Sequence, residues 1–236
     1  MDLPYWRLSA FYFCYFATLG SFLPFWSLYL KSQAFSADQI GELSACLIVT
    51  KMIAPQLFGW LADKSHRRMI WIRFSCLLSA LIFSGFLVQT NFNGFALISL
   101  CFSFFWNATL PQFEAATLFH LHNRLSQHYS RIRSWGSIGF IVAVIVVGQI
   151  LDYQGPERLP VIIVIVLTLN LLIAMTIPEA GMHHQTDAPQ GLFNIVFRKH
   201  TLAFFLVYLF LQVAHGPYYV FFSVYLKIHQ YTATET

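Results

Sequence analysis

Seven long apolar runs constrain the fold of this chain more than any other feature of its sequence. Each run has about 20 residues or more, the length that an α-helix needs to cross the hydrocarbon core of a bilayer. The runs are Trp6–Leu30, Ile40–Leu61, Met69–Gln89, Phe95–Phe119, Ile132–Leu151, Leu159–Ile177 and Thr201–Leu226. Because backbone polar groups in hydrocarbon must be paired within their own segment, we expect every run to be a helix. The sequence therefore predicts an all-α membrane protein.

Composition supports this class. Of the 236 residues, 57% are hydrophobic and only 10% are charged, against about 25% charged in an ordinary soluble domain. The net charge of +4 is small and is not clustered along an amphipathic stretch, so we expect a lipid bilayer as partner and not a nucleic acid. Four cysteines lie inside the apolar runs without the spacing of a metal site: Cys14, Cys46, Cys76 and Cys101. We therefore expect neither a metal ion nor another cofactor.

The connectors divide the chain into unequal parts. Residues 1–177 hold the first six runs with short connectors between them, which predicts a six-helix transmembrane bundle. Residues 178–199 are polar and interrupted by glycine and proline, which indicates a cytoplasmic linker. Residues 200–236 hold the seventh run. This order is typical of a protein built from two repeated bundles and cut early in the second one, so we expect residues 200–236 to supply the first helix of an incomplete C-terminal bundle.

Lysine and arginine side chains are distributed unequally between the two sides of these spans. Ten fall on the side of the N-terminus: Arg7, Lys64, Arg67, Arg68, Arg73, Arg124, Arg131, Arg133, Arg198 and Lys199. Three fall on the other side: Lys31, Arg158 and Lys227. Since cytoplasmic loops of multi-span proteins carry the excess of these residues, the asymmetry predicts a cytoplasmic N-terminus.

The loop between the second and third spans, residues 59–68, is a short basic turn. It resembles the loop between helices 2 and 3 of the major facilitator superfamily, whose pattern is Gly-x-x-x-Asp-(Arg/Lys)-x-Gly-(Arg/Lys)-(Arg/Lys). The matching residues are Gly59, Asp63, Lys64, Arg67 and Arg68. His66 replaces the second glycine, so we expect a looser turn. The resemblance implies a cytoplasmic gate motif, and the alternative is a basic hairpin that only sets the orientation.

Two charged residues fall inside apolar runs at similar depth. Lys51 lies eight residues before Gly59, or about 12 Å from the cytoplasmic end, and Glu114 lies six residues before His120, or about 9 Å from that end. An unpaired charge at such depth costs at least about 2.5–3.5 kcal/mol, so we expect the two to form an ion pair. Protonation of Glu114 would release Lys51 to an arriving anion, which is the chemistry of proton coupling. The alternative is a static pair that joins the second and fourth spans.

Aromatic and imidazole side chains in two spans are candidates for substrate contact. In the seventh span, His215, Tyr218 and Tyr219 share one helical face, and an imidazole beside phenols can hold a carboxylate or carry a proton. In the first span, Pro24 is expected to bend the helix, and Phe25 beside it is a candidate to stack on a flat substrate. The alternatives are helix packing for the first set and an interfacial aromatic belt for the second.

Three segments are similar to one branch of the superfamily, the phenylpropionate permease family. They are Phe22–Lys31, Arg133–Ser137 and Gln212–Tyr219. The family has a basic residue in helix 2 and an acidic residue in helix 4, where Lys51 and Glu114 stand. The resemblance spans the chain but only seven of the family's twelve helices.

This resemblance implies a secondary transporter of the bacterial inner membrane, monomeric when full length, that moves a small aromatic carboxylate with protons. The residues at positions 51 and 114 differ in kind from the family's usual arginine and aspartate, so a sugar or nucleoside symporter of the same superfamily is the alternative. For Arg133, near the start of the fifth span, three roles are open: a gate contact with Asp63, capping of free carbonyls, or one more cytoplasmic charge.

Two other classes of membrane protein are disfavoured by residue placement. A seven-span photoreceptor needs a lysine in the middle of its seventh span, whereas Lys227 is at the end of it. A membrane-embedded enzyme needs a clustered site, but the histidines that follow the fourth span have no acidic residue beside them: His120, His122 and His128. We therefore expect a transporter and not an enzyme.

Overall fold

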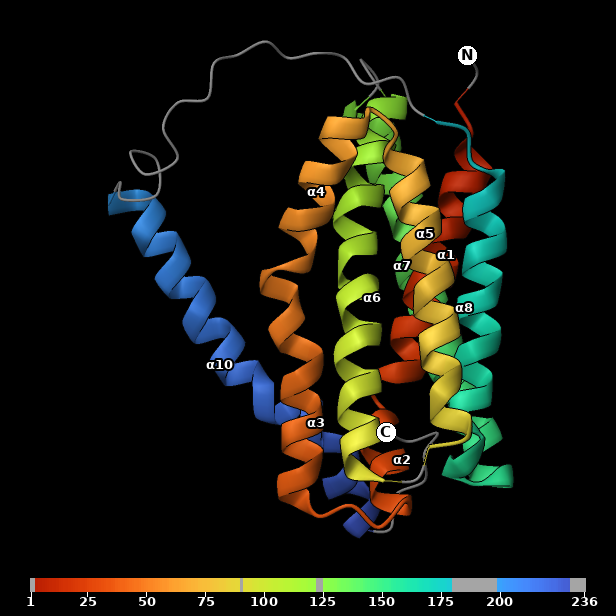
Figure 1. Ribbon diagram of the computed structural model, residues 1–236, viewed down its shortest axis with the longest axis vertical. Coiled ribbons are helices and arrows are strands. Elements are labelled where there is room, and N and C mark those ends of the chain that lie inside the picture. Colours follow the sequence, from red (N-terminus) through yellow and green to blue (C-terminus); the bar gives the residue numbers. More distant parts are fainter. Residues whose placement is uncertain (1–2, 90, 122–124, 180–198, 230–236) are drawn as a thin grey trace.

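All regular structure in the described part of the chain is helical (Figure 1). The computed structural model describes residues 3–89, 91–121, 125–179 and 199–229. The helices are α1 (Tyr5–Phe22), α2 (Trp26–Ser32), α3 (Ala37–Val49), α4 (Ala54–Ser65), α5 (Arg68–Phe83), α6 (Phe92–Leu121), α7 (Leu125–Gln154), α8 (Leu159–Thr176) and α10 (Lys199–Ile228), with 3-10 turns η1 (Thr50–Met52), η2 (Ser84–Leu87) and η4 (Pro156–Arg158). Six of the described spans are long and apolar enough to cross a membrane, and the number is seven if the bent pair α1–α2 is counted as one span. The all-α prediction is confirmed.

The first predicted span is bent where the sequence indicates. Helix α1 ends at Phe22 and α2 begins at Trp26, with an angle of 40° between them. Pro24 lies in the turn, and its ring and missing N–H prevent the helix from continuing straight. The predicted bend at Pro24 is therefore present.

The second predicted span is broken in its middle, a feature that was not predicted from the sequence. It consists of α3, the turn η1 and α4, and Pro55 stands at the start of α4. A proline cannot donate to the carbonyl four residues earlier, so polar backbone groups are left over at such a break. Helix α6 supplies partners there: Asn107 Nδ2 donates to the Leu47 carbonyl oxygen at 3.0 Å and to Thr50 Oγ1 at 2.8 Å. The break is thus stabilised by the neighbouring helix, as is usual for irregular backbone at membrane depth.

Two groups of helices make up the bundle. Helix α1 packs against α7 and α8, while α6 packs against α3, α4 and α5, so segments far apart in sequence lie side by side (Figure 1). The groups meet through stacked rings of α1 and α6. The ring centroids of Phe11 and Phe113 are 3.7 Å apart, and those of Tyr15 and Trp106 are 4.1 Å apart. On the other side α5 packs against α8.

The crossing of α1 and α7 depends on glycine. A Cβ atom on Gly139 would lie 2.2 Å from the Phe13 carbonyl oxygen, and one on Gly20 would lie 2.6 Å from the Phe140 carbonyl oxygen. Both distances are far below van der Waals contact, so only hydrogen side chains allow the two backbones to approach this closely. Small residues at helix contacts are the usual means of close packing in membranes.

Helix α10 leaves this bundle. It packs against α2, where Val220 contacts the hydrophobic core, and the rest of the helix runs outward from the bundle (Figure 1). Most of its described apolar side chains are exposed.

Candidate functional site

An ion pair between α6 and α7 forms the centre of the candidate site. Arg133 Nε lies 3.5 Å from Glu114 Oε1, and the two side chains are 32% and 35% exposed. Glu114 stands seven residues before the end of α6 and Arg133 eight residues after the start of α7. At 1.5 Å per residue both lie about 10–12 Å from the connection between the two helices. The pair is therefore inside the membrane-spanning region but open on one side.

Aromatic rings of α1 surround the cation. The Arg133 guanidinium carbon lies 4.1 Å from the ring centroid of Phe16 and 5.5 Å from that of Tyr12. The Tyr12 hydroxyl donates to Thr117 Oγ1 of α6 at 3.4 Å. Contacts of a guanidinium with ring faces stabilise the cation where water is scarce. The arrangement can hold an anion on Arg133 when Glu114 is neutral.

The predicted ion pair between Lys51 and Glu114 is not formed. Lys51 lies in η1, at the break of the second span, with an exposed side chain, and the ion pairs of the described residues do not include it. The prediction rested only on the similar depth of Lys51 and Glu114 in the membrane. Depth does not specify which way a side chain points around its helix, and Arg133, at the same depth beside the α6–α7 connection, takes the place assigned to Lys51.

The basic loop holds a second ion pair. Arg68 Nη2 lies 2.5 Å from Asp63 Oδ1, and the arginine side chain is 9% exposed. Arg68 also donates to the side-chain oxygen of Gln112 on α6. Gln112 in turn donates to the Pro55 carbonyl oxygen at 3.2 Å, and it passes close to Gly59, where a Cβ would be 3.3 Å from its amide nitrogen. The motif residues thus tie α4, α5 and α6 together at this end of the bundle.

The turn within the motif differs from the expectation. His66 caps α4 with φ 53° and ψ 22°, in the left-handed region that a glycine would occupy. The expected looser turn was therefore wrong, because the histidine adopts the tight conformation in spite of its Cβ. The proposed contact of Arg133 with Asp63 is not formed either, since each pairs with another residue. In the same loop Lys64 lies over the Trp60 ring at 5.0 Å, and Arg67 is exposed.

The predicted substrate contacts are not gathered at the ion pair. Phe25 is fully buried in the core beside the bend after α1, so it has no free face for a ligand. His215 Nδ1 lies 2.8 Å from the Leu211 carbonyl oxygen of its own helix, and Tyr218 lies against Phe222 with ring centroids 4.6 Å apart. The side chain of Tyr219 lies outside the described part of the structure.

Tyr12, Phe16 and Thr117 were not predicted as site residues, and the pairing of Arg133 with Glu114 was not among the roles predicted for it. A usable signal existed for the arginine, because Glu114 and Arg133 flank one short connection at equal depth. No comparable signal distinguished Tyr12 and Phe16 from the other aromatic residues of the first span. Among the described residues, no group of three His, Cys, Asp or Glu side chains is placed to hold a metal ion.

Comparison with known proteins identifies the family. Residues 5–236 match the family described as "MFS_1 like family". The chain belongs to the MFS_1-like family. The chain is 26% identical over 226 residues to the "Probable 3-phenylpropionic acid transporter" of Escherichia coli (strain K12), covering 94% of this chain and 59% of that protein. It is 27% identical over 183 residues to the "Maltose permease" of Geobacillus stearothermophilus, covering 77% of this chain and 45% of that protein.

A solved structure confirms the fold. The crystal structure of the nucleoside transporter NupG (D323A mutant) matches with a TM-score of 0.75 and 21% identity, over 92% of this chain and 57% of that one. The chain thus has the fold of a multi-pass membrane protein of this family, and it spans about half the length of the relatives that it matches. These relatives are named as transporters or as a permease.

Proposed function

We propose that this chain supplies one half of a secondary transporter that moves a small aromatic carboxylate together with protons. The observation that carries the proposal is the half-open Glu114–Arg133 pair against the rings of Tyr12 and Phe16. It replaces the Lys51–Glu114 pair as the coupling element.

The exchange of partners at Arg133 gives the mechanism. The guanidinium keeps its charge at all physiological pH values, so it needs an anionic partner inside the membrane region. Glu114 is that partner in the structure. When Glu114 takes a proton it loses its charge, and a substrate carboxylate replaces it on Arg133, held by paired N–H donors. Release of substrate and proton restores the ion pair.

The aromatic surroundings favour a flat apolar substrate. Phe16 already contacts one face of the guanidinium, and a substrate ring beside it would gain about 0.5–1.5 kcal/mol from ring packing. The name of the Escherichia coli relative agrees with such a substrate. A sugar or nucleoside symporter is the second candidate, favoured by the maltose permease among the relatives and by the nucleoside transporter among the solved structures.

The remaining parts of the proposal concern the assembly. We place the end of the bundle that carries the basic loop in the cytoplasm, with the protein monomeric in the bacterial inner membrane, because arginine and lysine collect at that end. Residues 1–177 are the first bundle, 178–199 the linker, and 200–236 the start of the second bundle. Lys51, His215, Tyr218 and Tyr219 stay candidates for substrate contact across the interface between the two bundles. Sites of such transporters form between repeated halves.

A chimaera tests the proposal. Residues 1–236 are joined to the remaining part of the Escherichia coli relative, replacing the segment to which they align, and the purified protein is reconstituted in proteoliposomes. We expect labelled 3-phenylpropionate to accumulate when the lumen is alkaline, and the chain without the second half to show no such uptake. The variant Glu114→Gln is expected to lose the dependence on the pH gradient, and Arg133→Gln to lose substrate binding.

Matched controls separate the pair from general charge loss. Arg131→Gln changes an exposed arginine two residues away, and Glu42→Gln an exposed glutamate on α3, so both are expected to keep gradient-driven uptake. Competition by maltose or uridine but not by phenylpropionate would favour the second candidate. Gradient-driven uptake that survives Glu114→Gln would contradict the coupling mechanism.

A further inference from the structure

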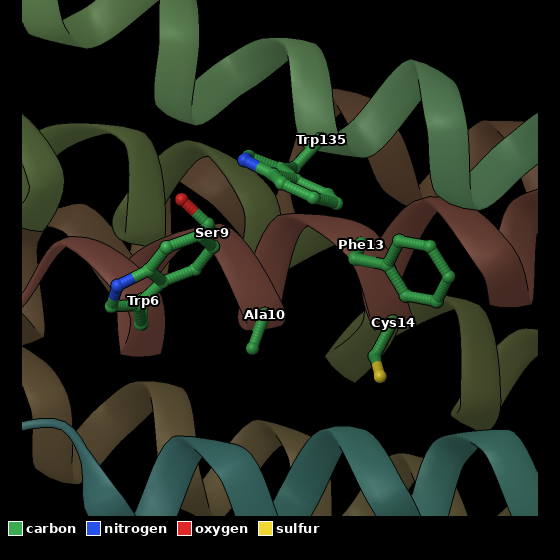
Figure 2. A pocket seen from close by; sticks show the side chains of 6 residues that line it. All are labelled: Trp6, Ser9, Ala10, Phe13, Cys14 and Trp135. Carbon is green, nitrogen blue, oxygen red and sulfur yellow. The ribbon is translucent and has the colours of Figure 1, made fainter.

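A pocket on the surface of α1 lies apart from the ion pair. It has a volume of about 220 Å³ and is lined by Trp6, Ser9, Ala10, Phe13, Cys14 and Trp135 (Figure 2). Pockets for small molecules usually measure about 300–1,000 Å³ and enclose most of the ligand. This pocket is smaller, and Trp6 at its edge is 70% exposed. It is therefore suited to a segment of a long apolar molecule and not to a whole transported substrate.

The position of the pocket points to the lipid side of the bundle. On α1, Phe11 and Tyr15 face α6, where they stack on Phe113 and Trp106. Trp6, Ala10 and Phe13 recur at helical spacing on another face. Figure 2 shows that this face lies between α7 and α8, which pack on the two sides of α1. The lining of the pocket thus includes neither the rings that stack on α6 nor Glu114.

One polar group inside the pocket has no partner in the described structure. Ser9 is 2% exposed, and its hydroxyl makes no hydrogen bond. Serines within helices usually bond to a carbonyl of the preceding turn, as Ser21 does with Ala17. Figure 2 shows the Ser9 oxygen between the indoles of Trp6 and Trp135. A buried hydroxyl without a partner loses its hydrogen bonds to water and gains none in return, so an acceptor supplied by a ligand would be favourable there.

We propose that this pocket binds one phospholipid, with an acyl chain lying against Trp6, Phe13 and Trp135 and an ester carbonyl accepting from the Ser9 hydroxyl. The depth of Ser9 fits this occupant. Ser9 lies four residues inside α1, or about 6 Å from its start. The interfacial layer on each side of the hydrocarbon core is about 5–8 Å thick, and it holds the ester groups of phospholipids.

The positive charge of Arg7, next to the pocket on α1, is complementary to a phosphate group. Arg7 lies three residues before Ala10, on the adjoining part of α1, and donates to the Thr176 carbonyl oxygen at the end of α8 at 2.8 Å. Its side chain is exposed, so its remaining donors are available at the headgroup level. The two indoles, with ring centroids 6.0 Å apart, are residues typical of the membrane–water interface. The site therefore offers apolar, hydrogen-bonding and cationic groups in the order in which a phospholipid presents its parts.

Native mass spectrometry of the purified chain tests the proposal. The chain is extracted in mild detergent, exchanged extensively, and titrated with phosphatidylethanolamine. We expect one phospholipid per chain to survive the exchange. The variant Ala10→Leu fills the pocket and is expected to abolish this binding, and Ser9→Ala is expected to weaken it about fivefold, as for the loss of one ordinary hydrogen bond.

Two control variants change similar residues at exposed positions elsewhere in the spans. Ala45→Leu enlarges an exposed alanine of α3, and Thr168→Ala removes an exposed hydroxyl of α8 that bonds to its own helix. Both are expected to retain the phospholipid. Circular dichroism and gel filtration establish whether each variant is folded. If Ala10→Leu does not fold, Ser9→Ala still tests whether the pocket binds the phospholipid. Retention of no phospholipid by the unmodified chain, or equal retention by the folded Ala10→Leu and Ser9→Ala variants, would overturn the proposal.

Discussion

Replacement of Gly139 by alanine is the sharpest test of the packing between α1 and α7. The new Cβ would lie 2.2 Å from the Phe13 carbonyl oxygen, 2.8 Å from its carbonyl carbon and 2.9 Å from its Cα. All three atoms belong to the backbone of α1, so no side-chain rotation relieves the overlap. Ordinary contact begins at 3.4 Å, which requires the helices to separate locally by about 1 Å or more.

The cost follows from this separation. Overpacking of a filled interior costs about 1–3 kcal/mol, and a gap of 0.5–1 Å forfeits a quarter to a half of the dispersion energy of the atoms on each side. Alanine also gains up to about 1 kcal/mol over glycine as a helix former. The overlap outweighs this gain, and we expect a net destabilisation of about 1–2 kcal/mol, or about 2–8 °C in the melting temperature for a chain of this size.

A thermal melt followed with a thiol-reactive dye measures the effect, because all four cysteines lie within the spans and Cys76 is only 1% exposed. Gly41→Ala is the matched control, since its Cβ would meet nothing within 4 Å in helix α3. That variant is expected to melt at the same temperature as the unmodified chain or slightly higher. If Gly139→Ala melts within about 1 °C of the unmodified chain, α1 and α7 do not pack as described.

Three further outcomes are expected. His66 holds a left-handed conformation, so His66→Gly should keep or raise the melting temperature. The β-branched variant His66→Val should lower the stability by about 1–2 kcal/mol. The reverse order of the two variants would contradict the left-handed turn. Asn107→Leu removes the donor to the Leu47 carbonyl and to Thr50 and should cost about 1–2 kcal/mol in the same melt, whereas an unchanged melt would show that the break of the second span does not need α6. An impermeant thiol reagent added to intact cells should label a cysteine at Glu157 and not one at Ser65, and the opposite pattern would reverse the proposed orientation.

The number and position of the spans were predictable from the sequence, because the requirement behind them acts on each segment alone. A segment in hydrocarbon must be apolar and must pair its own backbone groups, so hydropathy is enough to find it. The bend at Pro24 follows from one residue in the same way. The basic loop could also be recognised from the sequence, since its residues are contiguous and Asp63 pairs with Arg68 five positions away.

The candidate site depended on the tertiary structure. Depth along a helix is encoded in the count of residues, but depth alone predicted Lys51 as the partner of Glu114, and the structure has Arg133 there instead. The identity of the partner depends on how α6 and α7 are rotated about their axes, and that rotation is set by long-range contacts such as Gly139 against Phe13 and Phe113 against Phe11. The pocket at Ser9 has the same origin, because an unpaired hydroxyl becomes visible only when the helices on both sides of it are in place.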